Sequence, residues 1–149
     1  EPYRRQRQMC IRDREVEAGD CVIDQYGNLV GVVKEVGTNW ALVDTLLDPG
    51  MELGVRVART DDSAMAQGDF SLMGEGKLRM TYIPQDAQLI SGDQVTTSGL
   101  GGKYPGGLLV GQVESIEAEA DGISRSAVLR PSADVENIRY VYVITNFEG

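Results

Sequence analysis

The stretch from Thr96 to Val113 reads TTSGLGGKYPGGLLVGQV. It holds six glycines and one proline between Gly99 and Gly111, a composition that disfavours both helix and regular strand. Such a segment has two common uses, a backbone cradle for phosphate or a turn whose geometry side chains forbid. A shorter version of the same segment occurs earlier, at residues 23–33. A duplicated segment favours an architectural role over a ligand site.

Four short matches in the same order relate the first part of the chain to the last. Residues 19–20 and 92–93 are both Gly-Asp, a turn pair that precedes a strand. Gly31 and Gly111 each interrupt a strand-like run, where glycine marks a bulge or sharp bend. The difference in residue number between matched positions rises from 73 to 80 along the two copies. We therefore interpret the matches as a duplicated β-unit whose second copy has a loop that is seven residues longer. The matched segments are 19–22 with 92–95, 27–33 with 107–113, 47–49 with 129–131, and Val55 and Val57 with Val141 and Val143.

Strand patterns dominate the chain from Val16 onward. Short runs rich in Val, Ile, Thr and Tyr are separated by Gly, Asp, Asn and Pro. Within residues 77–83, Leu78, Met80 and Tyr82 alternate with polar residues, which predicts a strand with one buried face. We see no amphipathic helix of ten or more residues in this part of the sequence. The expected strands lie near residues 21–24, 29–36, 41–47, 55–59, 63–67, 77–83, 94–97, 108–117, 124–130 and 140–145.

These patterns predict an all-β fold with little helix, made of two small antiparallel β-barrel lobes that arise from the repeat. The first lobe is expected at residues 15–89 and the second at residues 90–149. Two further strands follow the first unit, whereas the chain ends after the second. We therefore expect the second lobe to lack strands that sequence upstream of Val16 would supply.

The N-terminal segment differs from the rest of the chain. Five of residues 1–14 are arginine, and the apolar residues follow neither a helical nor a strand period. The string RQMCIRDR at residues 7–14 resembles a translated sequencing adapter. We expect residues 1–14 to be non-native, or to form a basic, helical or disordered arm.

The composition excludes several classes of function. The formal charge is −9, from 23 acidic and 14 basic residues, which argues against a general nucleic-acid binder. Histidine is absent, so a Ser-His-Asp or Cys-His nucleophile and a histidine metal site are excluded. Cys10 and Cys21 are too few for a disulfide framework, and we expect Cys21 to be a small buried residue. We expect no metal and no cofactor, and no apolar run is long enough to cross a bilayer.

The glycine-rich stretch does not match a nucleotide-binding loop. Thr97 stands where a Walker motif needs its first glycine, and Tyr104 stands where Ser or Thr should follow Lys103. Ser98 lacks the Gly-X-Ser-X-Gly pattern of a nucleophile elbow, and no histidine exists to activate it. We expect a tight hairpin loop, or a loop that packs on another domain or on a partner.

The remaining candidates for chemistry also favour structural roles. The carboxylates of residues 61–62 and of Glu117, Glu119 and Asp121 lie in polar, turn-like stretches. Acid–base catalysis needs carboxylates whose pKa values a pocket drives apart, so solvated surface charges are expected here. Trp40 follows a turn, where we expect it to pack at the end of a barrel rather than to hold a ligand.

Several of these segments together resemble the MreC family of bacterial rod-shape-determining proteins. They are residues 27–33, 47–49, 78–84 and 97–107, in that order, and the last block is the most specific. The likeness covers about residues 15–147. It implies two β-barrel lobes related to the double barrel of chymotrypsin-like proteases, without catalytic machinery.

The resemblance also implies a function. Members of the family scaffold the cell-elongation complex on the outer side of the cytoplasmic membrane, where they organise peptidoglycan synthesis and maintain cell shape. They link the MreB and MreD components to penicillin-binding peptidoglycan synthases, and they self-associate. They carry an N-terminal transmembrane helix and a helical self-associating segment, neither of which we recognise in residues 1–149. The chain is therefore expected to be a non-enzymatic scaffold without a cofactor.

The tip of the glycine-rich loop is our predicted partner contact. Lys103, Tyr104 and Pro105 form an aromatic and basic tip, and tyrosine is favoured at interfaces. Two other functions stay open on the residues alone. A degenerate hydrolase on the same double barrel needs a pocket with a perturbed titrating group. A nucleic-acid- or ribosome-associated barrel module needs phosphate contacts, which the charge of −9 disfavours.

Overall fold

A computed structural model describes residues 6–10, 16–100, 104–119, 125–138 and 141–145. Within these ranges nearly all regular structure is β, which confirms the predicted all-β fold with little helix. The helical elements are one turn of α-helix, α1 (Phe70–Met73), and one 3-10 turn, η1 (Val135–Asn137). The strands are β1 (Gln6–Cys10), β2 (Cys21–Ile23), β3 (Leu29–Val36), β4 (Trp40–Thr45), β5 (Glu52–Val57), β6 (Ser63–Gln67), β7 (Leu78–Thr81), β8 (Gln94–Thr97), β9 (Leu109–Ala118), β10 (Arg125–Pro131) and β11 (Tyr142–Ile144).

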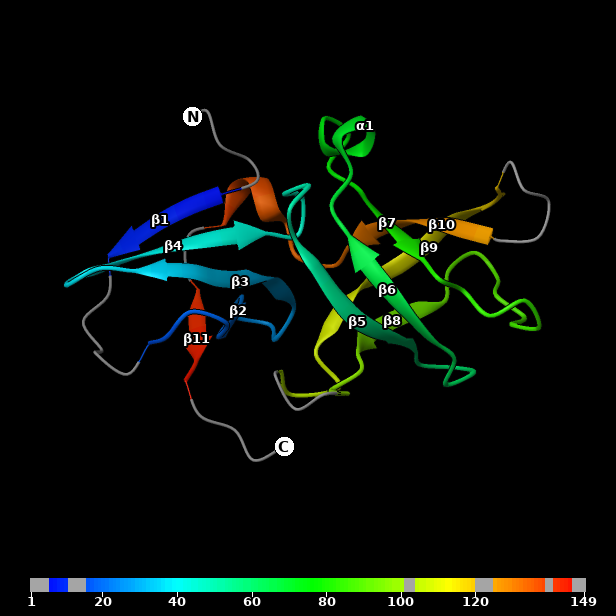
Figure 1. Ribbon diagram of the computed structural model, residues 1–149, viewed down its shortest axis with the longest axis horizontal. Helices are drawn as coiled ribbons and strands as arrows, with labels where there is room; N and C mark the ends of the chain where they lie inside the picture. Colours follow the sequence, from blue (N-terminus) through cyan, green and yellow to red (C-terminus); the bar gives the residue numbers. More distant parts are fainter. Residues whose placement is uncertain (1–5, 11–15, 101–103, 120–124, 139–140, 146–149) are drawn as a thin grey trace.

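Six strands form a closed antiparallel barrel in the order β10-β7-β6-β5-β8-β9 (Figure 1). Closure leaves no edge strand, because β10 pairs with both β7 and β9. Side chains alternate between the interior and the surface along each strand. In β7, Leu78 and Met80 are fully buried whereas Arg79 faces outward. Tyr82, which the alternation placed on the same buried face, is exposed because the strand ends at Thr81.

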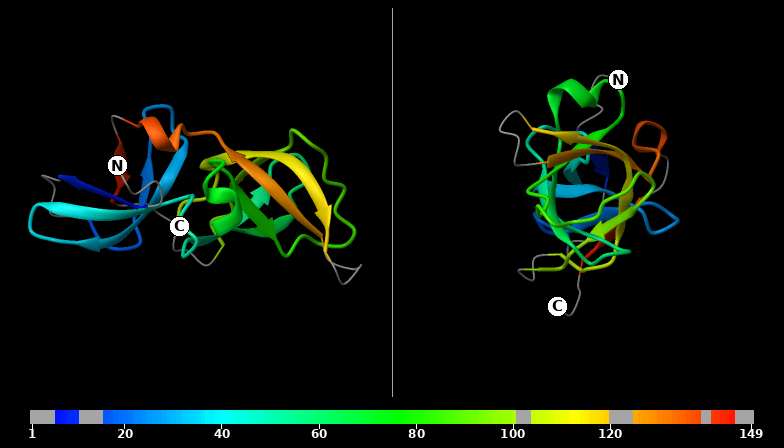
Figure 2. Two further views of the ribbon diagram at one scale, coloured as in Figure 1. Left: turned by 90° about the horizontal axis from the view of Figure 1, so that it is seen from above. Right: turned by 90° about the vertical axis from the view of Figure 1, so that its right-hand side faces the viewer.

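The other five strands form a second sheet beside the barrel, in the order β1-β4-β3-β2-β11 (Figures 1 and 2). Its own core contains Val22, Val33 and Val43, covered by Ala133 and Val135 from the segment around η1. On the opposite face of the sheet, residues at the ends of β2 and β3 contribute to the barrel core. Cys21 and Leu29 belong to that larger cluster, so the sheet is buried on both faces where it meets the barrel.

Strands β2-β3-β4 and β8-β9-β10 have matching registers. Val22 lies opposite Gly31 and Val95 lies opposite Gly111, and a bulge follows each pair. In both units the glycine before the first strand donates a hydrogen bond to the second strand. The N–H of Gly19 donates to the carbonyl of Val33, and the N–H of Gly92 donates to the carbonyl of Val113, each at 2.7 Å. The predicted match of residues 47–49 with 129–131 is displaced in the structure. Thr45 lies opposite Gly31 and Pro131 lies opposite Gly111, so these two residues occupy equivalent positions.

The strand that follows each three-stranded unit pairs with the other unit. β5 follows the first unit but pairs with β8 of the second, with Val57 opposite Val95. β11 follows the second unit but pairs with β2 of the first, with Val143 opposite Val22. The barrel therefore comprises the consecutive strands β5 to β10, whereas the sheet combines β1 to β4 with β11. The predicted boundary between residues 89 and 90 falls inside the barrel.

Two further expectations about missing segments differ from the structure. The barrel that contains β8, β9 and β10 is closed by β5, β6 and β7, so it needs no strand from upstream of Val16. Residues 6–10 form β1, which pairs with β4 from Gln6 opposite Asp44 to Cys10 opposite Trp40. These residues belong to the sheet rather than to a separate arm, and the rest of the predicted arm lies outside the described residues.

Gly31 and Gly111 permit the closest backbone approaches between strands. A Cβ atom on Gly111 would lie 2.2 Å from the carbonyl oxygen of Arg130, and one on Gly31 would lie 2.2 Å from that of Asp44. We predict that Gly111→Ala lowers the free energy of unfolding by about 1–3 kcal/mol, because backbone atoms must move to make room. Urea denaturation measures the effect. Gly74→Ala is the matched control, since no atom lies within 4 Å of its Cβ position, and an equal loss in both variants would contradict the explanation.

Asp69 couples the stability of the barrel surface to pH. Its carboxylate accepts hydrogen bonds from the side chain of Ser71 and from Arg79, and these lower its pKa to about 2. A lowered pKa stabilises the fold above the unfolded value near 3.8, and the contribution disappears as the pH falls towards 2. We predict that Asp69→Asn is less stable than wild type by about 1 kcal/mol at pH 7, and that the two converge near pH 2. Thermal melts across this range provide the test, and a pH-independent difference would contradict it.

Candidate partner-binding surfaces

The glycine-rich segment is a closed hairpin loop between β8 and β9. Its arms meet at Gly99, whose φ is +72° and whose Cβ position lies 2.9 Å from the Cα of Gly106. Below this crossing, the fully buried hydroxyl of Thr97 donates to the carbonyl of Pro105 at 2.7 Å and accepts from the N–H of Leu108 at 3.0 Å. The described part of the loop uses its N–H groups and glycines to hold its own shape. This geometry agrees with the hairpin interpretation rather than with a phosphate cradle.

The predicted tip packs partly inward. Tyr104 is half-buried against the barrel core together with Leu108 and Ile144. Burial raises the pKa of the Tyr104 phenol, and the nearby Cys21 adds to the increase. Since Cys21 lies in β2 and Ile144 in β11, Tyr104 fills the junction between barrel and sheet.

The other predicted contacts of this loop are placed differently. Pro105 is half-buried, and its carbonyl is used by Thr97. Lys103 lies outside the described residues. The side chain that the described part of the loop exposes most is Leu100, at 72%. The prediction that Tyr104 forms an exposed aromatic tip is therefore wrong, whereas the predicted hairpin loop agrees with the structure.

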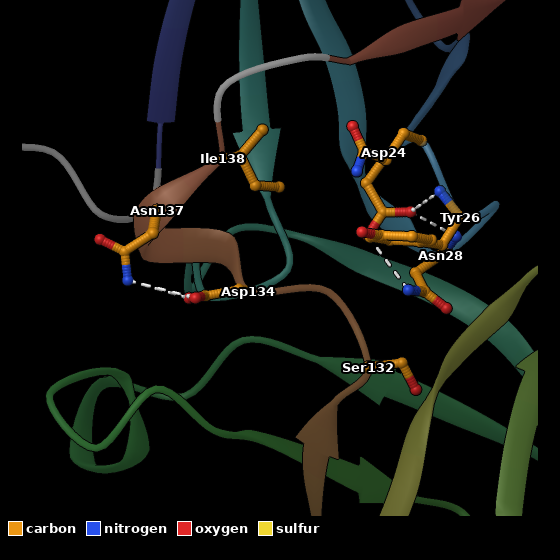
Figure 3. Close-up of a pocket in the computed structure, with 8 residues that line it drawn as sticks. Asp24, Tyr26, Asn28, Ser132, Asp134, Asn137 and Ile138 are labelled. Carbon is orange, nitrogen blue, oxygen red and sulfur yellow. Dashed lines mark hydrogen bonds between the residues drawn. The ribbon is translucent and has the colours of Figure 1, made fainter.

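A recess of about 400 Å³ opens between the β2–β3 turn and the segment after β10 (Figure 3). Asp24 shapes one wall, where Oδ1 accepts from the N–H groups of Tyr26 and Asn28 at 2.9 Å and Oδ2 accepts from Asn28 Nδ2 at 3.1 Å. On the other wall, Asp134 accepts from Asn137 Nδ2 at 3.2 Å. The lining residues are Asp24, Gln25, Tyr26, Asn28, Ser132, Asp134, Asn137 and Ile138.

The carboxylates that line the recess are engaged by the fold itself. The Asp24 carboxylate is already used by its own turn, and Asp134 is bonded to η1. Ser132 has no histidine to activate it, because the sequence contains none. Within the described residues, no group of three or more His, Cys, Asp and Glu side chains is placed to hold a metal ion.

The other sequence candidates have structural partners. Asp61 pairs with Arg56 at 3.2 Å, and Glu117 pairs with Arg79 at 3.0 Å. Glu119 accepts a hydrogen bond from Ser126 at 2.7 Å.

Trp40 and Cys21 are also used by the fold. The Trp40 ring covers Gly37 so closely that a Cβ there would lie 2.1 Å from it. Cys21 is 1% exposed, and burial raises its thiol pKa to about 12, so the thiol is unreactive.

Sequence reasoning missed the exposed aromatic residues. Tyr26, Phe70, Tyr82 and Tyr142 are between 57% and 78% exposed, although aromatic residues usually bury most of their surface. The position of Tyr26 in a turn is a sequence signal that could have predicted its exposure. The strand pattern through Tyr82 instead predicted that its side chain is buried. In addition, no helix in the described ranges has the length and apolar character needed to cross a bilayer.

Comparison with known proteins then assigns the family. The family described as "Rod shape-determining protein MreC, barrel core" matches residues 7–145, which include both the barrel and the sheet. The chain belongs to the MreC family. The cell shape-determining protein MreC of Listeria monocytogenes is 29% identical over 133 residues, covering 84% of this chain and 43% of that protein. The Bacillus subtilis MreC is 31% identical over 131 residues, covering 83% and 45%. The chain thus spans less than half the length of these relatives.

Solved structures of MreC proteins have the same fold. MreC from Pseudomonas aeruginosa matches with a TM-score of 0.84 at 26% identity, covering 97% of this chain and 92% of that one. MreC from Helicobacter pylori, solved as a complex with Penicillin-Binding Protein (PBP2), matches at 0.72 with 20% identity, covering 95% and 87%. A structure described as the major periplasmic domain of the cell shape-determining filament MreC matches at 0.71 with 22% identity, covering 86% and 78%.

The position of Tyr104 predicts unequal effects of two loop substitutions. Tyr104→Ala removes packing at the junction and is expected to lower the free energy of unfolding by about 2 kcal/mol. Leu100→Ala removes an exposed side chain and is expected to change it by about 0.5 kcal/mol or less. Urea denaturation of the two variants measures both values. Equal stability of the two variants would show that Tyr104 does not join barrel and sheet.

Proposed function

We propose that this chain is the extracytoplasmic scaffold region of a bacterial cell-elongation complex, which organises peptidoglycan synthesis and maintains cell shape through protein–protein contacts. The observation that carries the proposal is its membership of the MreC family, together with the solved complex of a relative with a penicillin-binding protein. The fold suits this role because a closed barrel holds its connecting loops in fixed positions.

The proposed role is non-enzymatic. The carboxylates singled out from the sequence and described by the structure pair with arginine or accept hydrogen bonds from serine or threonine. The recess is lined by turn-forming side chains, and no histidine is available as a general base. The degenerate-hydrolase alternative therefore lacks support. The nucleic-acid alternative lacks it too, because the net charge is −9 and the family is one of shape-determining proteins.

The location and the wider set of partners are part of the proposal. A relative described by its periplasmic domain supports a position outside the cytoplasmic membrane. Anchoring by a transmembrane helix, contact with MreB and MreD components, and self-association follow from the family resemblance. Contact with a penicillin-binding peptidoglycan synthase has the most direct support, from the complex of the Helicobacter pylori relative.

The glycine-rich loop remains the proposed contact for such a synthase, but the residues proposed to make the contact change. Leu100 is exposed and Lys103 carries the charge, whereas Tyr104 and Pro105 support the loop from inside. In the described part of the loop, the Thr97 hydroxyl bonds to Pro105 and Leu108 and so fixes the base from which Leu100 projects.

We predict that the double variant Leu100→Ala and Lys103→Ala weakens binding to the extracytoplasmic region of a penicillin-binding synthase by about tenfold and leaves the melting temperature unchanged. Surface plasmon resonance with the 149-residue chain measures the affinity. Phe70→Ala, at an equally exposed residue on α1, is the control. Unchanged affinity of the double variant would remove the loop from the interface, and no binding by the wild-type chain would contradict the proposed function.

A further inference from the structure

The two repeated units close the hairpin between their first two strands in the same way. In the first unit, the N–H of Asp24 donates to the carbonyl of Asn28 at 2.9 Å, and the N–H of Asn28 donates to Asp24 Oδ1 at 2.9 Å. In the second unit, the N–H of Thr97 donates to the carbonyl of Leu108 at 2.8 Å, and the N–H of Leu108 donates to Thr97 Oγ1 at 3.0 Å. Asn28 and Leu108 therefore hold equivalent positions.

The segments that follow the two units also share their backbone hydrogen bonds. The N–H of Leu46 donates to the second strand of the first unit, and the N–H of Ser132 donates to the second strand of the second unit, each at 3.0 Å. Further along each segment, the N–H groups of Met51 and Asn137 donate to the carbonyl of the aspartate three residues earlier, at 2.9 and 3.1 Å. Ser132 is thus equivalent to Leu46, and Asn137 is equivalent to Met51.

These matched positions are closed in one copy and open in the other. Leu46 and Met51 are buried in the barrel core, at 0% and 4% exposure, and Leu108 packs against the same core. The equivalent residues of the other copy are polar and line the recess of about 400 Å³ described above (Figure 3): Asn28, Ser132 and Asn137. The backbone that the two copies share therefore does not require polar side chains at these positions, and the turn geometry alone does not explain the recess.

The recess offers a ligand uncharged hydrogen-bonding groups. No lysine or arginine is among its lining residues, so it has no counter-charge for a phosphate or a carboxylate. Its two carboxylates already accept hydrogen bonds from neighbouring N–H groups. Within the described part of the chain, the Ser132 hydroxyl, the Tyr26 phenol and the Gln25 amide have no hydrogen-bond partner. A neutral ligand that carries hydroxyl and amide groups complements this set.

An exposed aromatic ring forms part of one wall of the recess. Tyr26 is 78% exposed and belongs to the β2–β3 turn, whereas Ile138, a half-buried apolar residue, lies on the other side (Figure 3). An aromatic ring beside amides and a hydroxyl suits a sugar, whose ring has an apolar C–H face and a polar rim. The volume of about 400 Å³ falls in the range of small-molecule sites, about 300–1,000 Å³.

We propose that this recess binds an uncharged, N-acetylated saccharide. The Tyr26 ring packs on the C–H face of one sugar, while the Gln25 and Asn137 amides and the Ser132 hydroxyl bond to its hydroxyl and acetamido groups. The choice of a saccharide among neutral ligands rests on the proposed function, because peptidoglycan strands consist of N-acetylated sugars. The site would add a glycan contact to the protein contacts of the scaffold.

The test titrates the 149-residue chain with triacetylchitotriose and with cellotriose, and isothermal titration calorimetry measures the affinities. Triacetylchitotriose should bind, and cellotriose, which lacks the acetamido groups, should bind more weakly by about fivefold or more. Raising NaCl from about 0.05 M to about 0.5 M should change the affinity by less than about twofold, because the contacts are uncharged. Tighter binding of the neutral peptide acetyl-Gly-Gln-Ser-Gly-amide would assign the recess to a protein segment and overturn the inference.

Substitutions in the recess separate the contributions of ring and space. Tyr26→Ala should weaken triacetylchitotriose binding by about tenfold or more, and Tyr26→Phe should bind nearly as wild type because the ring is retained. Ser132→Leu introduces the residue type of the closed copy and should abolish binding by filling the recess. Because both side chains are exposed, these variants should melt close to the wild-type temperature. Tyr82→Ala is the matched control, since Tyr82 is 77% exposed but does not line the recess.

The inference is overturned if triacetylchitotriose does not bind, if the two sugars bind equally, or if Tyr26→Ala binds as wild type. These outcomes are distinguishable from failure of the scaffold proposal. Binding of the wild-type chain to a penicillin-binding synthase without sugar binding would sink this inference alone. Sugar binding that depends on Tyr26, without synthase binding, would contradict the proposed synthase contact and leave the saccharide site established.

Discussion

The pairing of β5 with β8 determines how the rest of the structure is arranged. β5 follows the first three-stranded unit in sequence, but its partner is the first strand of the second unit. β11 repeats the arrangement in reverse, because it follows the second unit and pairs with β2 of the first. The barrel is thus continuous in sequence from β5 to β10, whereas the sheet combines β1 to β4 with β11 from the end of the chain. The two repeated units exchange the strands that follow them, and each exchanged pair lies within one body: β5 with β8 in the barrel, and β11 with β2 in the sheet.

This exchange explains why the junction between sheet and barrel is well filled. β2 stands beside β11 and β3, and its Cys21 side chain reaches the barrel core. Tyr104 enters the same region from the glycine-rich loop, and a parallel bridge joins Asn28 to Leu109. A scaffold benefits from such a junction because partners bound at different positions are then held at a fixed separation.

The sequence predicted the individual strands and turns well, but it did not predict which strands belong to the barrel and which to the sheet. Turn glycines, the strand pattern and the match of Val57 with Val143 all describe short-range geometry, and these two valines do occupy equivalent positions opposite Val95 and Val22. Which unit a strand pairs with depends on hydrogen bonds between distant residues, and no residue of β5 encodes that choice locally. The predicted lobe boundary was therefore misplaced although nearly every strand was expected.

The site was harder to predict than the fold, for a related reason. Tyr104 is adjacent to charged and glycine residues, a context that suggests exposure, yet it packs at a junction created by β2 and β11. Tyr82 continues the apolar alternation of β7, a context that suggests burial, yet the strand ends one residue earlier. In both cases the burial of the side chain depends on where a strand ends or on which distant strands lie nearby, and the neighbouring residue types do not record either.

Position 82 also differs from every other described position with positive φ. Six of these residues are glycines, at which only the backbone conformation matters, and a seventh is Asp61, a residue type that adopts this region readily. A glycine at position 82 would satisfy the same turn without strain. The loop does not need an aromatic side chain for its own packing, because Ile83, Ala87 and Leu89 already fill the barrel end beneath it. The turn and the packing of the loop therefore do not explain why position 82 holds a tyrosine.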